Sequence, residues 1–324
     1  MMNPLREYIG RTFCIQPRIP ETVQLEITNL CNLNCKMCPR KKLPVKYKEM
    51  SRSLFKEIVN NLKGVKEIIL TGWGEPTTHK ELAEMVRYGK FKNKKVRLTT
   101  NGLLLNEKLR DKLTKAGIDS ITFSVDSVDE NNEWGHMNKK TLDNIRALSR
   151  MKNRPSIVIQ SILEKPISNL LAICDFAKSI GAERLNLSRV LQEFSPGMPR
   201  PSLNEEKEMV DKIFKHGRKI GLQVDMIQYG VGSGLIRAVY PLAKRTMGLF
   251  GERCLRLFNY AYVNVEGDVT PCCLLPSLKV GNIKTQRIEE IWQSRGFRRF
   301  RKNHNNHKLC KNCDLWRINY INNS

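Results

Sequence analysis

The chain has 324 residues, 40% of them hydrophobic and 27% charged, and Lys plus Arg exceed Asp plus Glu by 56 − 32 = 24. This is the composition of a folded protein with room for one large and one smaller domain, and no apolar run approaches the ~18 residues of a membrane span. A disordered or membrane-spanning chain is therefore excluded. Without a signal-peptide core at its N-terminus, we expect a cytoplasmic protein.

Residues 1–20 hold three prolines and form a lead-in with little regular structure. From Glu21 onward, short β-like runs alternate with helix-length amphipathic segments, the pattern of βα units that wind a parallel sheet. In such a sheet, ligands collect where the strands end and the loops begin. The predicted strands are 22–28, 67–71, 95–100, 120–126, 156–163 and 184–188, and the predicted helices are 51–62, 80–88, 106–116, 140–151 and 168–180.

Three cysteines, Cys31, Cys35 and Cys38, lie in one short stretch after the first predicted strand. Three thiolates can ligate three irons of a [4Fe-4S] cube, which normally has four cysteine ligands, and leave the fourth iron open to a substrate. Zinc sites close with four ligands, and no Cys or His follows within the next thirty residues. The pattern therefore indicates an iron–sulfur cluster that performs chemistry.

The spacing Cys-x3-Cys-x2-Cys, with the apolar Met37 before the third cysteine, resembles the signature of the radical S-adenosylmethionine (SAM) superfamily. The resemblance implies an α/β fold, a partial (β/α)6 barrel. It also implies that a [4Fe-4S] cluster on Cys31, Cys35 and Cys38 binds SAM and cleaves it reductively to methionine and a 5′-deoxyadenosyl radical. That radical abstracts hydrogen from an unactivated position of a substrate.

Polar motifs follow the later strands as well. The run Thr-Gly-Trp-Gly-Glu-Pro at 71–76 looks like the glycine-rich segment with which the family holds the amino group of SAM, while Trp73 stays unassigned. For Asn101 the alternative to ligand binding is that Asn-Gly simply begins a turn. Gln160 and Ser161 are polar residues in a strand that we expect to be buried, so they need hydrogen-bond partners, and a bound ligand is one candidate. The SAM contacts that the resemblance implies are Met37, Gly72, Gly74, Glu75, Asn101, Ser124, Asp126, Ser188 and Arg189.

Beyond the sixth strand the pattern becomes weaker. A helix is predicted over 203–217 and a short strand over 222–227, while 229–251 reads only as a connection between domains. Cys174 lies on the apolar stripe of a predicted helix, so we expect it to pack in the core, and we expect the same of the isolated Cys14.

Five more cysteines, Cys254, Cys272, Cys273, Cys310 and Cys313, occupy the last part of the chain. Two β-like runs joined by Glu-Gly-Asp predict a hairpin between the first two of them, which would bring its flanks together. Four thiolates of this kind suit either a closed zinc site or an iron–sulfur cluster.

The arrangement Cys-x12-Gly-x4-Cys, with Gly267 as its glycine and followed by a distant CxxC pair, resembles the C-terminal SPASM/twitch extension of radical SAM enzymes. A full SPASM domain binds two auxiliary clusters, but no cysteine follows Cys313, so we expect one auxiliary [4Fe-4S] cluster. The Gly-x4-Cys match selects Cys272 over Cys273, which makes the expected ligands Cys254, Cys272, Cys310 and Cys313. The expected domains are a lead-in (1–20), the barrel (21–228), a connection (229–251) and a small cysteine-rich α+β SPASM/twitch-like domain (252–324).

The sequence is consistent with three functions. The first is a redox-type modification of a peptide or protein by an oxidoreductase-type radical SAM enzyme; the second is dehydrogenation or cofactor biosynthesis on a small anionic metabolite. The third is a basic iron–sulfur scaffold that binds RNA, but the basic residues are dispersed and carry no recognised nucleic-acid motif. A basic face on the apolar-striped segment 283–302 favours docking of an acidic electron donor such as flavodoxin or ferredoxin, or of an acidic peptide.

Overall fold

The protein is described by a computed structural model that covers residues 16–44, 47–129, 139–163, 166–226, 230–231, 253–254 and 256–315. Cys14 and nearly all of the predicted connection 229–251 lie outside these residues. Within them, no helix is long and apolar enough to cross a bilayer.

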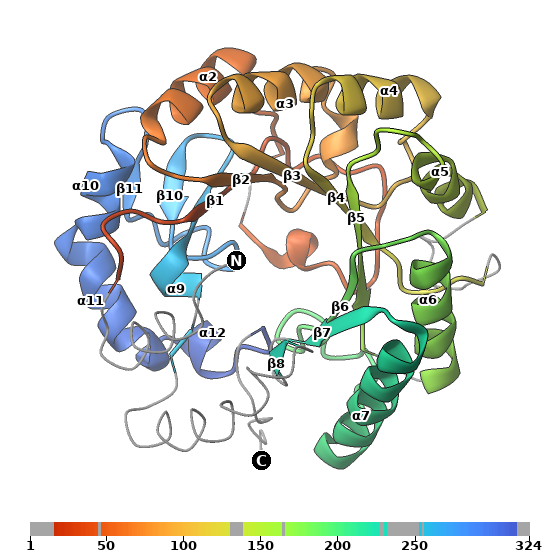
Figure 1. Ribbon diagram of the computed structural model, residues 1–324. Helices are drawn as coiled ribbons and strands as arrows, with labels where there is room; N and C mark the ends of the chain where they lie inside the picture. Colours follow the sequence, from red (N-terminus) through yellow and green to blue (C-terminus); the bar gives the residue numbers. More distant parts are fainter. Residues whose placement is uncertain are drawn as a thin grey trace.

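Short parallel strands alternate with helices through the first two thirds of the chain, and the helices lie on the outer side of the curved sheet (Figure 1). Strands covered on both faces are mostly apolar, as in the Ile-Val-Ile run of the fifth strand. The strands are β1 (Thr22–Leu25), β2 (Glu67–Leu70), β3 (Lys95–Thr100), β4 (Ser120–Ser124), β5 (Ser156–Ile162), β6 (Arg184–Ser188) and β7 (Gln223–Met226). The helices are α2 (Arg52–Asn61), α3 (Leu82–Phe91), α4 (Glu107–Lys115), α5 (Lys139–Ser149), α6 (Ile167–Ser179) and α7 (Leu203–Ile220).

The sheet is a partial barrel, as the sequence predicts, and all six predicted βα strands are confirmed with ends that differ by a few residues. The end of α7 differs because Gly217 is a packing glycine rather than a stop. A Cβ atom there would lie 2.6 Å from Val224 Cγ2 and 2.9 Å from the carbonyl oxygen of Leu222. The helix instead ends at Gly221, which takes a left-handed φ of 68°.

The last part of the chain continues the same sheet. A hairpin forms where Glu-Gly-Asp predicts one, with Val269 opposite Val263 and a turn in which Gly267 has a φ of 86°. Its first strand pairs in parallel with the free edge of β1, so that Thr22 faces Tyr260. The elements of this last part are α9 (Arg256–Asn259), β9 (Tyr260–Val263), β10 (Asp268–Thr270), β11 (Gly281–Asn282), α10 (Ile288–Gln293), α11 (Arg295–Asn303), η3 (His304–Asn306) and α12 (Lys308–Lys311). Elsewhere, β8 (Gly230–Val231) pairs with β7, and η1 (Pro39–Lys42) and η2 (Pro76–Thr78) are short 3-10 helices of the barrel loops.

The strand order is β11-β10-β9-β1-β2-β3-β4-β5-β6-β7-β8, and one hydrophobic core runs through both parts of it. Val23 and Leu25 of β1 share that core with Ala261 and Val263 of β9. The predicted helical face over 283–302 is realised as two helices, α10 and α11, because Ser294 caps the second one by accepting from the Phe297 amide. The domain boundary between barrel and extension stays a prediction.

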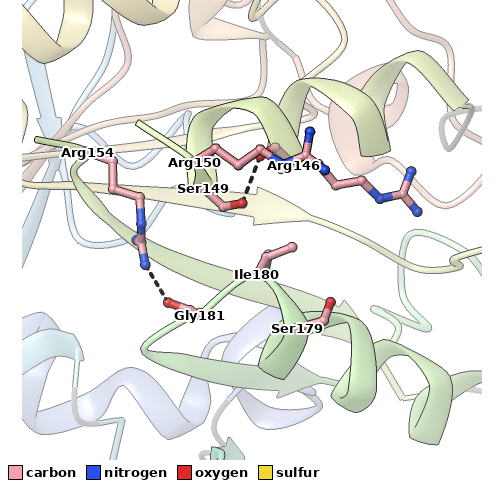
Figure 2. Close-up of a pocket in the computed structure, with 7 residues that line it drawn as sticks. All are labelled: Arg146, Ser149, Arg150, Arg154, Ser179, Ile180 and Gly181. Atoms are coloured by element: carbon pink, nitrogen blue, oxygen red, sulfur yellow. Dashed lines mark hydrogen bonds between the residues drawn. The ribbon is translucent and has the colours of Figure 1, made fainter. Parts of the chain in front are cut away.

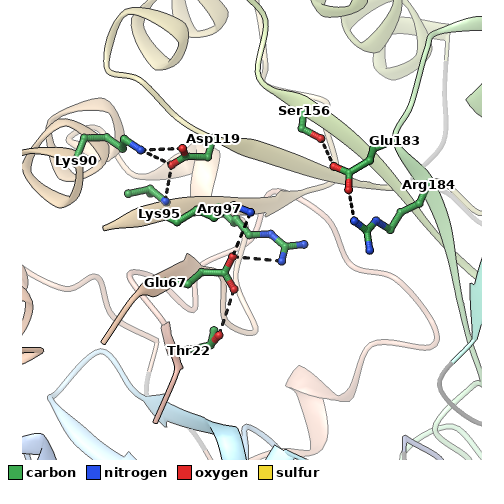
Figure 3. A network of polar contacts seen from close by, with 10 residues as sticks. Thr22, Glu67, Lys90, Lys95, Arg97, Asp119, Ser156, Glu183 and Arg184 are labelled. Carbon is green, nitrogen blue, oxygen red and sulfur yellow. Dashed lines mark hydrogen bonds and ion pairs between the residues drawn. The ribbon is translucent and has the colours of Figure 1, made fainter. Parts of the chain in front are cut away.

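Ion pairs close the amino-terminal end of the barrel (Figure 3). Glu67 at the start of β2 lies 3.5 Å from Arg97, and Lys90 lies 2.6 Å from Asp119 just before β4. Glu183 accepts a hydrogen bond of 2.5 Å from Ser156. Because these groups lie at the starts of the strands, they stabilise the end of the barrel opposite to the cysteine loop.

A cavity of about 510 Å³ lies between the carboxyl-terminal ends of α5 and α6 (Figure 2). The Arg154 guanidinium reaches across it and donates to the carbonyl oxygen of Gly181 at 2.9 Å. The cavity is at the strand starts, away from the cysteines, so it is not the candidate site. Its lining residues are Arg146, Ser149, Arg150, Arg154, Ser179, Ile180 and Gly181.

Candidate active site

The first cysteine loop follows β1 at the carboxyl end of the barrel, where the sequence predicts it. Cys31, Cys35 and Cys38 are all partly exposed. The Leu33 amide donates to the Cys31 sulfur at 3.4 Å, and the Cys38 amide donates to the Cys35 carbonyl oxygen at 3.2 Å. Burial raises the pKa of the Cys31 thiol, and the hydrogen bond from Leu33 opposes that shift. The backbone thus folds the loop into a compact turn that leaves its thiols accessible.

The glycine-rich run 71–76 lies directly against the segment that leads into this loop. A Cβ atom on Gly74 would be 2.3 Å from the carbonyl oxygen of Leu30 and 2.6 Å from that of Thr28. The Glu75 amide donates to the Leu30 carbonyl oxygen at 2.8 Å. Only glycine permits this approach, so Gly74 brings the two motifs together.

Glu75 ties the same run to the end of β3. One of its carboxylate oxygens accepts from the hydroxyls of Thr77 and Thr100, each at 2.6 Å, and the other accepts from the Asn101 amide at 2.8 Å. The Asn101 side chain then donates to Asn32 in the cysteine loop at 3.0 Å. Burial raises the pKa of Glu75, whose side chain is enclosed. The protein itself therefore occupies the Glu75 oxygens, and a contact of Glu75 with SAM stays a prediction.

The strand ends on the other side of the barrel hold the remaining predicted SAM contacts. Asp126 accepts from the Ile162 amide at 2.8 Å, which joins the ends of β4 and β5. Arg189 forms a buried ion pair with Glu206 of α7, with a nitrogen–oxygen distance of 2.5 Å. A SAM carboxylate would have to share Arg189 with Glu206. The roles of Ser124, Asp126, Ser188 and Arg189 stay predictions.

The connection after β6 reaches the cysteine loop from a third direction. The Ser195 hydroxyl donates to the carbonyl oxygen of Met37 at 3.0 Å. The carboxyl ends of β1, β3 and β6 thus contribute to one region around the three cysteines. The structure brings Met37, Gly74, Glu75 and Asn101 to it.

The second group of cysteines gathers at the carboxyl end of the added hairpin. The pKa of Cys313 is raised mainly by burial and further by the nearby sulfurs of Cys272, Cys254 and Cys310. Within the described residues, no three Cys, His, Asp or Glu side chains are close enough to hold one metal ion. Cys272 and Cys313 pack against the same small apolar cluster, so they lie in one neighbourhood where a cluster could be held.

Cys272 and Cys273 differ in their surroundings. A hydrogen bond from the Cys273 thiol lowers the pKa of Cys272 to about 6, and the positive charge of Arg256 adds to this effect. The pKa of Cys273 is raised by the same hydrogen bond and by burial. Cys272 is also partly exposed, whereas Cys273 is buried in a small apolar cluster, so Cys272 as the ligand stays the prediction made from the Gly-x4-Cys match.

Cys254 is held by a buried network that sequence reasoning did not find. Its backbone amide donates to His304 Nε2 at 3.1 Å, and the other ring nitrogen of His304 lies 3.0 Å from the carbonyl oxygen of Arg301. Arg301 is fully buried and donates to the carbonyl oxygens of Leu257 and Trp292, at 2.7 and 2.8 Å. The guanidinium carbon lies 3.9 Å from the ring centroid of Trp292. These side chains position the first cysteine of the second group.

One residue joins the two cysteine regions. Trp73, in the glycine-rich run, donates from its indole nitrogen to the carbonyl oxygen of Cys273 at 3.0 Å, although the two residues are 200 positions apart. Its backbone amide donates to the buried carboxylate of Glu26 at 3.0 Å. Glu26 follows β1 directly and falls within the predicted strand 22–28, so a charged residue in a strand of a sheet covered on both faces was the signal that could have marked it.

Comparison with known proteins agrees with this geometry. Residues 25–163 match the profile of the radical SAM superfamily, and residues 254–314 match that of SPASM, an iron–sulfur cluster-binding domain. This chain belongs to the radical SAM superfamily. The two matched segments are those that carry the two groups of cysteines described above.

Similar proteins have several activities. An AdoMet-dependent heme synthase of Methanosarcina barkeri is 24% identical over 85% of this chain and 82% of its own length. A PqqA peptide cyclase of Bradyrhizobium diazoefficiens is 26% identical over 93% of this chain and 80% of its own. The crystal structure of Streptococcus suis SuiB bound to the precursor peptide SuiA has a TM-score of 0.71 at 14% identity, covering 92% of this chain and 72% of SuiB.

This radical SAM enzyme uses SAM and [4Fe-4S] clusters as its cofactors, as the two matched domains require. The residues present fit them. The three partly exposed thiols of the first loop would hold a cluster with one open iron, and the thiols around Cys313 would hold a further one.

Proposed function

We propose that this radical SAM enzyme performs a redox-type modification of a peptide or protein and uses one auxiliary [4Fe-4S] cluster to do so. The contact between Trp73 and Cys273 carries this proposal, because it joins the run expected to hold SAM to the loop expected to hold the auxiliary cluster. A substrate at the carboxyl end of the barrel would then lie near both. The PqqA peptide cyclase and the peptide-bound SuiB among the similar proteins support a peptide substrate.

The cofactors supply the difficult step: reductive cleavage of SAM yields a radical that removes hydrogen from the substrate. The protein's own residues bind and orient. In this proposal Gly72, Gly74 and Glu75 shape the SAM site from one side, and Ser188 and Arg189 from the other.

The number of auxiliary clusters follows from the cysteine inventory. Of the ten cysteines, three belong to the first loop, Cys174 and Cys273 are buried among apolar side chains, and Cys14 lies outside the described residues. Burial raises the pKa of the Cys174 thiol to about 12. Cys254, Cys272, Cys310 and Cys313 supply the four ligands of one cube. The oxidative outcome follows from this cluster, because it would accept the electron that a substrate radical loses.

Iron analysis of anaerobically reconstituted enzyme tests the cluster count. Two cubes give about eight irons per chain. A value near half of that, together with stoichiometric zinc, would replace the auxiliary cluster by a zinc site. With dithionite and SAM, the loaded enzyme should form 5′-deoxyadenosine, and a loaded enzyme that forms none would favour an iron–sulfur scaffold instead.

A small anionic metabolite is the second candidate substrate, favoured by the net charge of +24 and by the heme synthase among the similar proteins. Deuterium transfer separates the two candidates. Deuterated peptides encoded by neighbouring genes, or deuterated metabolites, are incubated with enzyme and SAM, and the deoxyadenosine is analysed by mass spectrometry. Label from a peptide supports the first candidate, and label from a metabolite alone supports the second.

A further inference from the structure

Helix α11 has an exposed face made of cations. Phe297 and Arg301 on its opposite face are completely buried and hold the helix on the molecule. On the outer side, exposed cations recur at spacings of three and four, so they share one face of the helix. We call these four residues the basic patch: Arg295, Arg298, Arg299 and Lys302.

In the part of the chain that the structure describes, no acidic residue forms an ion pair with the basic patch. Residues 291–313 contain no Asp or Glu. The next acid in the chain, Asp314, is buried and pairs with Arg200 at 2.7 Å. The contrast with α4 is clear, because that helix alternates its lysines with Glu107 and Asp111.

The basic patch adjoins the cysteines expected to bind the auxiliary cluster. Helix α11 leads through η3 directly into α12, which contains Cys310, and the rings of Phe300 and His307 are 6.2 Å apart across this connection. Lys308 and Lys311 are exposed on either side of Cys310. Positive charge thus continues from the outer helix, seen at the edge of the molecule in Figure 1, to the cysteine pair.

We propose that the basic patch is the docking surface for an acidic one-electron carrier protein of the flavodoxin or ferredoxin class. Electron tunnelling falls exponentially with distance, so such a carrier has to sit close to a redox centre. A patch of one sign next to the CxxC pair meets that need and steers an acidic partner to it. This inference rests on the proposed function, because it needs the auxiliary cluster.

Electron transfer from the carrier to the enzyme forms and breaks no covalent bond. One electron would leave the reduced carrier, pass through the auxiliary centre and move on to the first centre, where SAM cleavage consumes it. Passing this electron on leaves the auxiliary centre oxidised again, so that it can accept the electron that the substrate radical gives up, and no proton or atom is transferred. An exposed helix face is also a surface to which RNA can bind, whereas a small metabolite needs a concave site. The position of the patch beside Cys310 favours a protein carrier, and RNA binding is an outcome of the test below.

The test uses loaded full-length enzyme and compares two triple variants with the same charge change. One is R298E/R299E/K302E in the basic patch; the other is K108E/K112E/K115E, three exposed lysines of α4. Bleaching of the cluster absorbance by reduced flavodoxin, and separately by reduced ferredoxin, is followed by stopped flow. The patch variant should be reduced roughly ten-fold more slowly at low salt, and the α4 variant should stay within about two-fold of wild type.

The difference should shrink at high ionic strength, where a Debye length below roughly 10 Å screens exposed charges. Deoxyadenosine formation with dithionite should be equal in all three proteins, which separates failure of docking from failure of the proposed function. If the patch variant does not load its clusters, R298Q/R299Q/K302Q replaces it, and we then expect a smaller decrease in the rate of reduction by the carrier.

Equal carrier kinetics in wild type and the patch variant would overturn the proposal, as would equal slowing in both triple variants. Fluorescence anisotropy with a single-stranded RNA oligonucleotide completes the test. If the patch variant loses RNA binding while its reduction by carriers is unchanged, the basic patch is an RNA surface and the proposal is wrong.

Discussion

The two cysteine groups of this enzyme are built in opposite ways. Cys31, Cys35 and Cys38 lie in one loop, whose shape comes from backbone hydrogen bonds and from the glycine-rich run packed behind it. Cys254 and Cys313 come from separate elements and meet only because the hairpin and the last helices pack together. A site made from one loop can be predicted from the spacing of its cysteines in the sequence. A site made from several elements depends on the hydrophobic core that holds those elements together.

The largest expected effect comes from removing one cysteine from each group. Cys35→Ala should abolish deoxyadenosine formation with dithionite and SAM, because the first cluster would lose a ligand of its own loop. Cys310→Ala should spare much of that activity while lowering the iron content by about half. Liquid chromatography of deoxyadenosine and iron analysis check both. Equal loss of deoxyadenosine formation in the two variants would contradict the prediction that only the first cysteine group is needed for SAM cleavage.

Arg301→Ala should disrupt the second cysteine group and leave the first one intact. The substitution leaves two buried carbonyl oxygens without a donor and removes a cation between two aromatic rings, at a cost of about 3–5 kcal/mol. Urea unfolding and iron analysis measure the effect, and the first cluster should stay loaded. Arg298→Ala, on the exposed side of the same helix, is the matched control with a change below about 0.5 kcal/mol. A similar loss in both variants would show that helix propensity, not the buried contacts, accounts for it.

Glu75→Gln should weaken the first group. The new amide keeps one acceptor oxygen and places an NH2 group at the other position, where Glu75 now accepts either from the Asn101 amide or from the Thr77 amide and the Thr100 hydroxyl. This mismatch costs about 2 kcal/mol. We expect lower stability toward urea and weaker SAM binding by equilibrium dialysis, with the auxiliary cluster unaffected. Glu57→Gln on the exposed side of α2 serves as the control. Unchanged SAM binding in the Glu75 variant would mean that the glycine-rich run keeps its position without this carboxylate.

The smallest expected effect concerns the hairpin that supports the second group. Burial alone would raise the pKa of Asp268, but hydrogen bonds from Lys279, Asn282 and Asn264 outweigh it and lower that pKa below 3.8. Because the folded-state pKa is depressed, Asp268 stabilises the protein above about pH 4 and loses this contribution as the pH falls through the folded-state pKa.

Asp268→Asn should therefore reduce the free energy of unfolding by roughly 1 kcal/mol at pH 7 and by less at pH 3. Urea unfolding at the two pH values checks this. Asp143→Asn, which removes a surface pair with Arg146, should show little pH dependence. An equal pH dependence in the two variants would contradict the role given to Asp268.

Much of the first site is contained in the sequence. The spacing of Cys31, Cys35 and Cys38, the alternation of strands and helices, and the Glu-Gly-Asp turn are local patterns, and local patterns are decided by neighbours in the chain. They predicted the wound parallel sheet, the cysteine loop at its carboxyl end and the hairpin, all of which the structure contains, whereas the partial barrel followed from the resemblance to the radical SAM superfamily. Helix ends were less predictable, because a glycine such as Gly217 can serve packing as well as termination.

Only the tertiary structure decided how the two sites are joined. Pairing of β9 with β1, the hydrogen bond from Trp73 to Cys273, and the support of Cys254 by His304 connect residues 50 to more than 200 positions apart. Periodicity and spacing carry no information about such partners, since any apolar strand suits the free edge of β1 and any carbonyl oxygen suits an indole N–H. The choice among them is made when the whole chain buries its apolar surface and satisfies its buried polar groups at once.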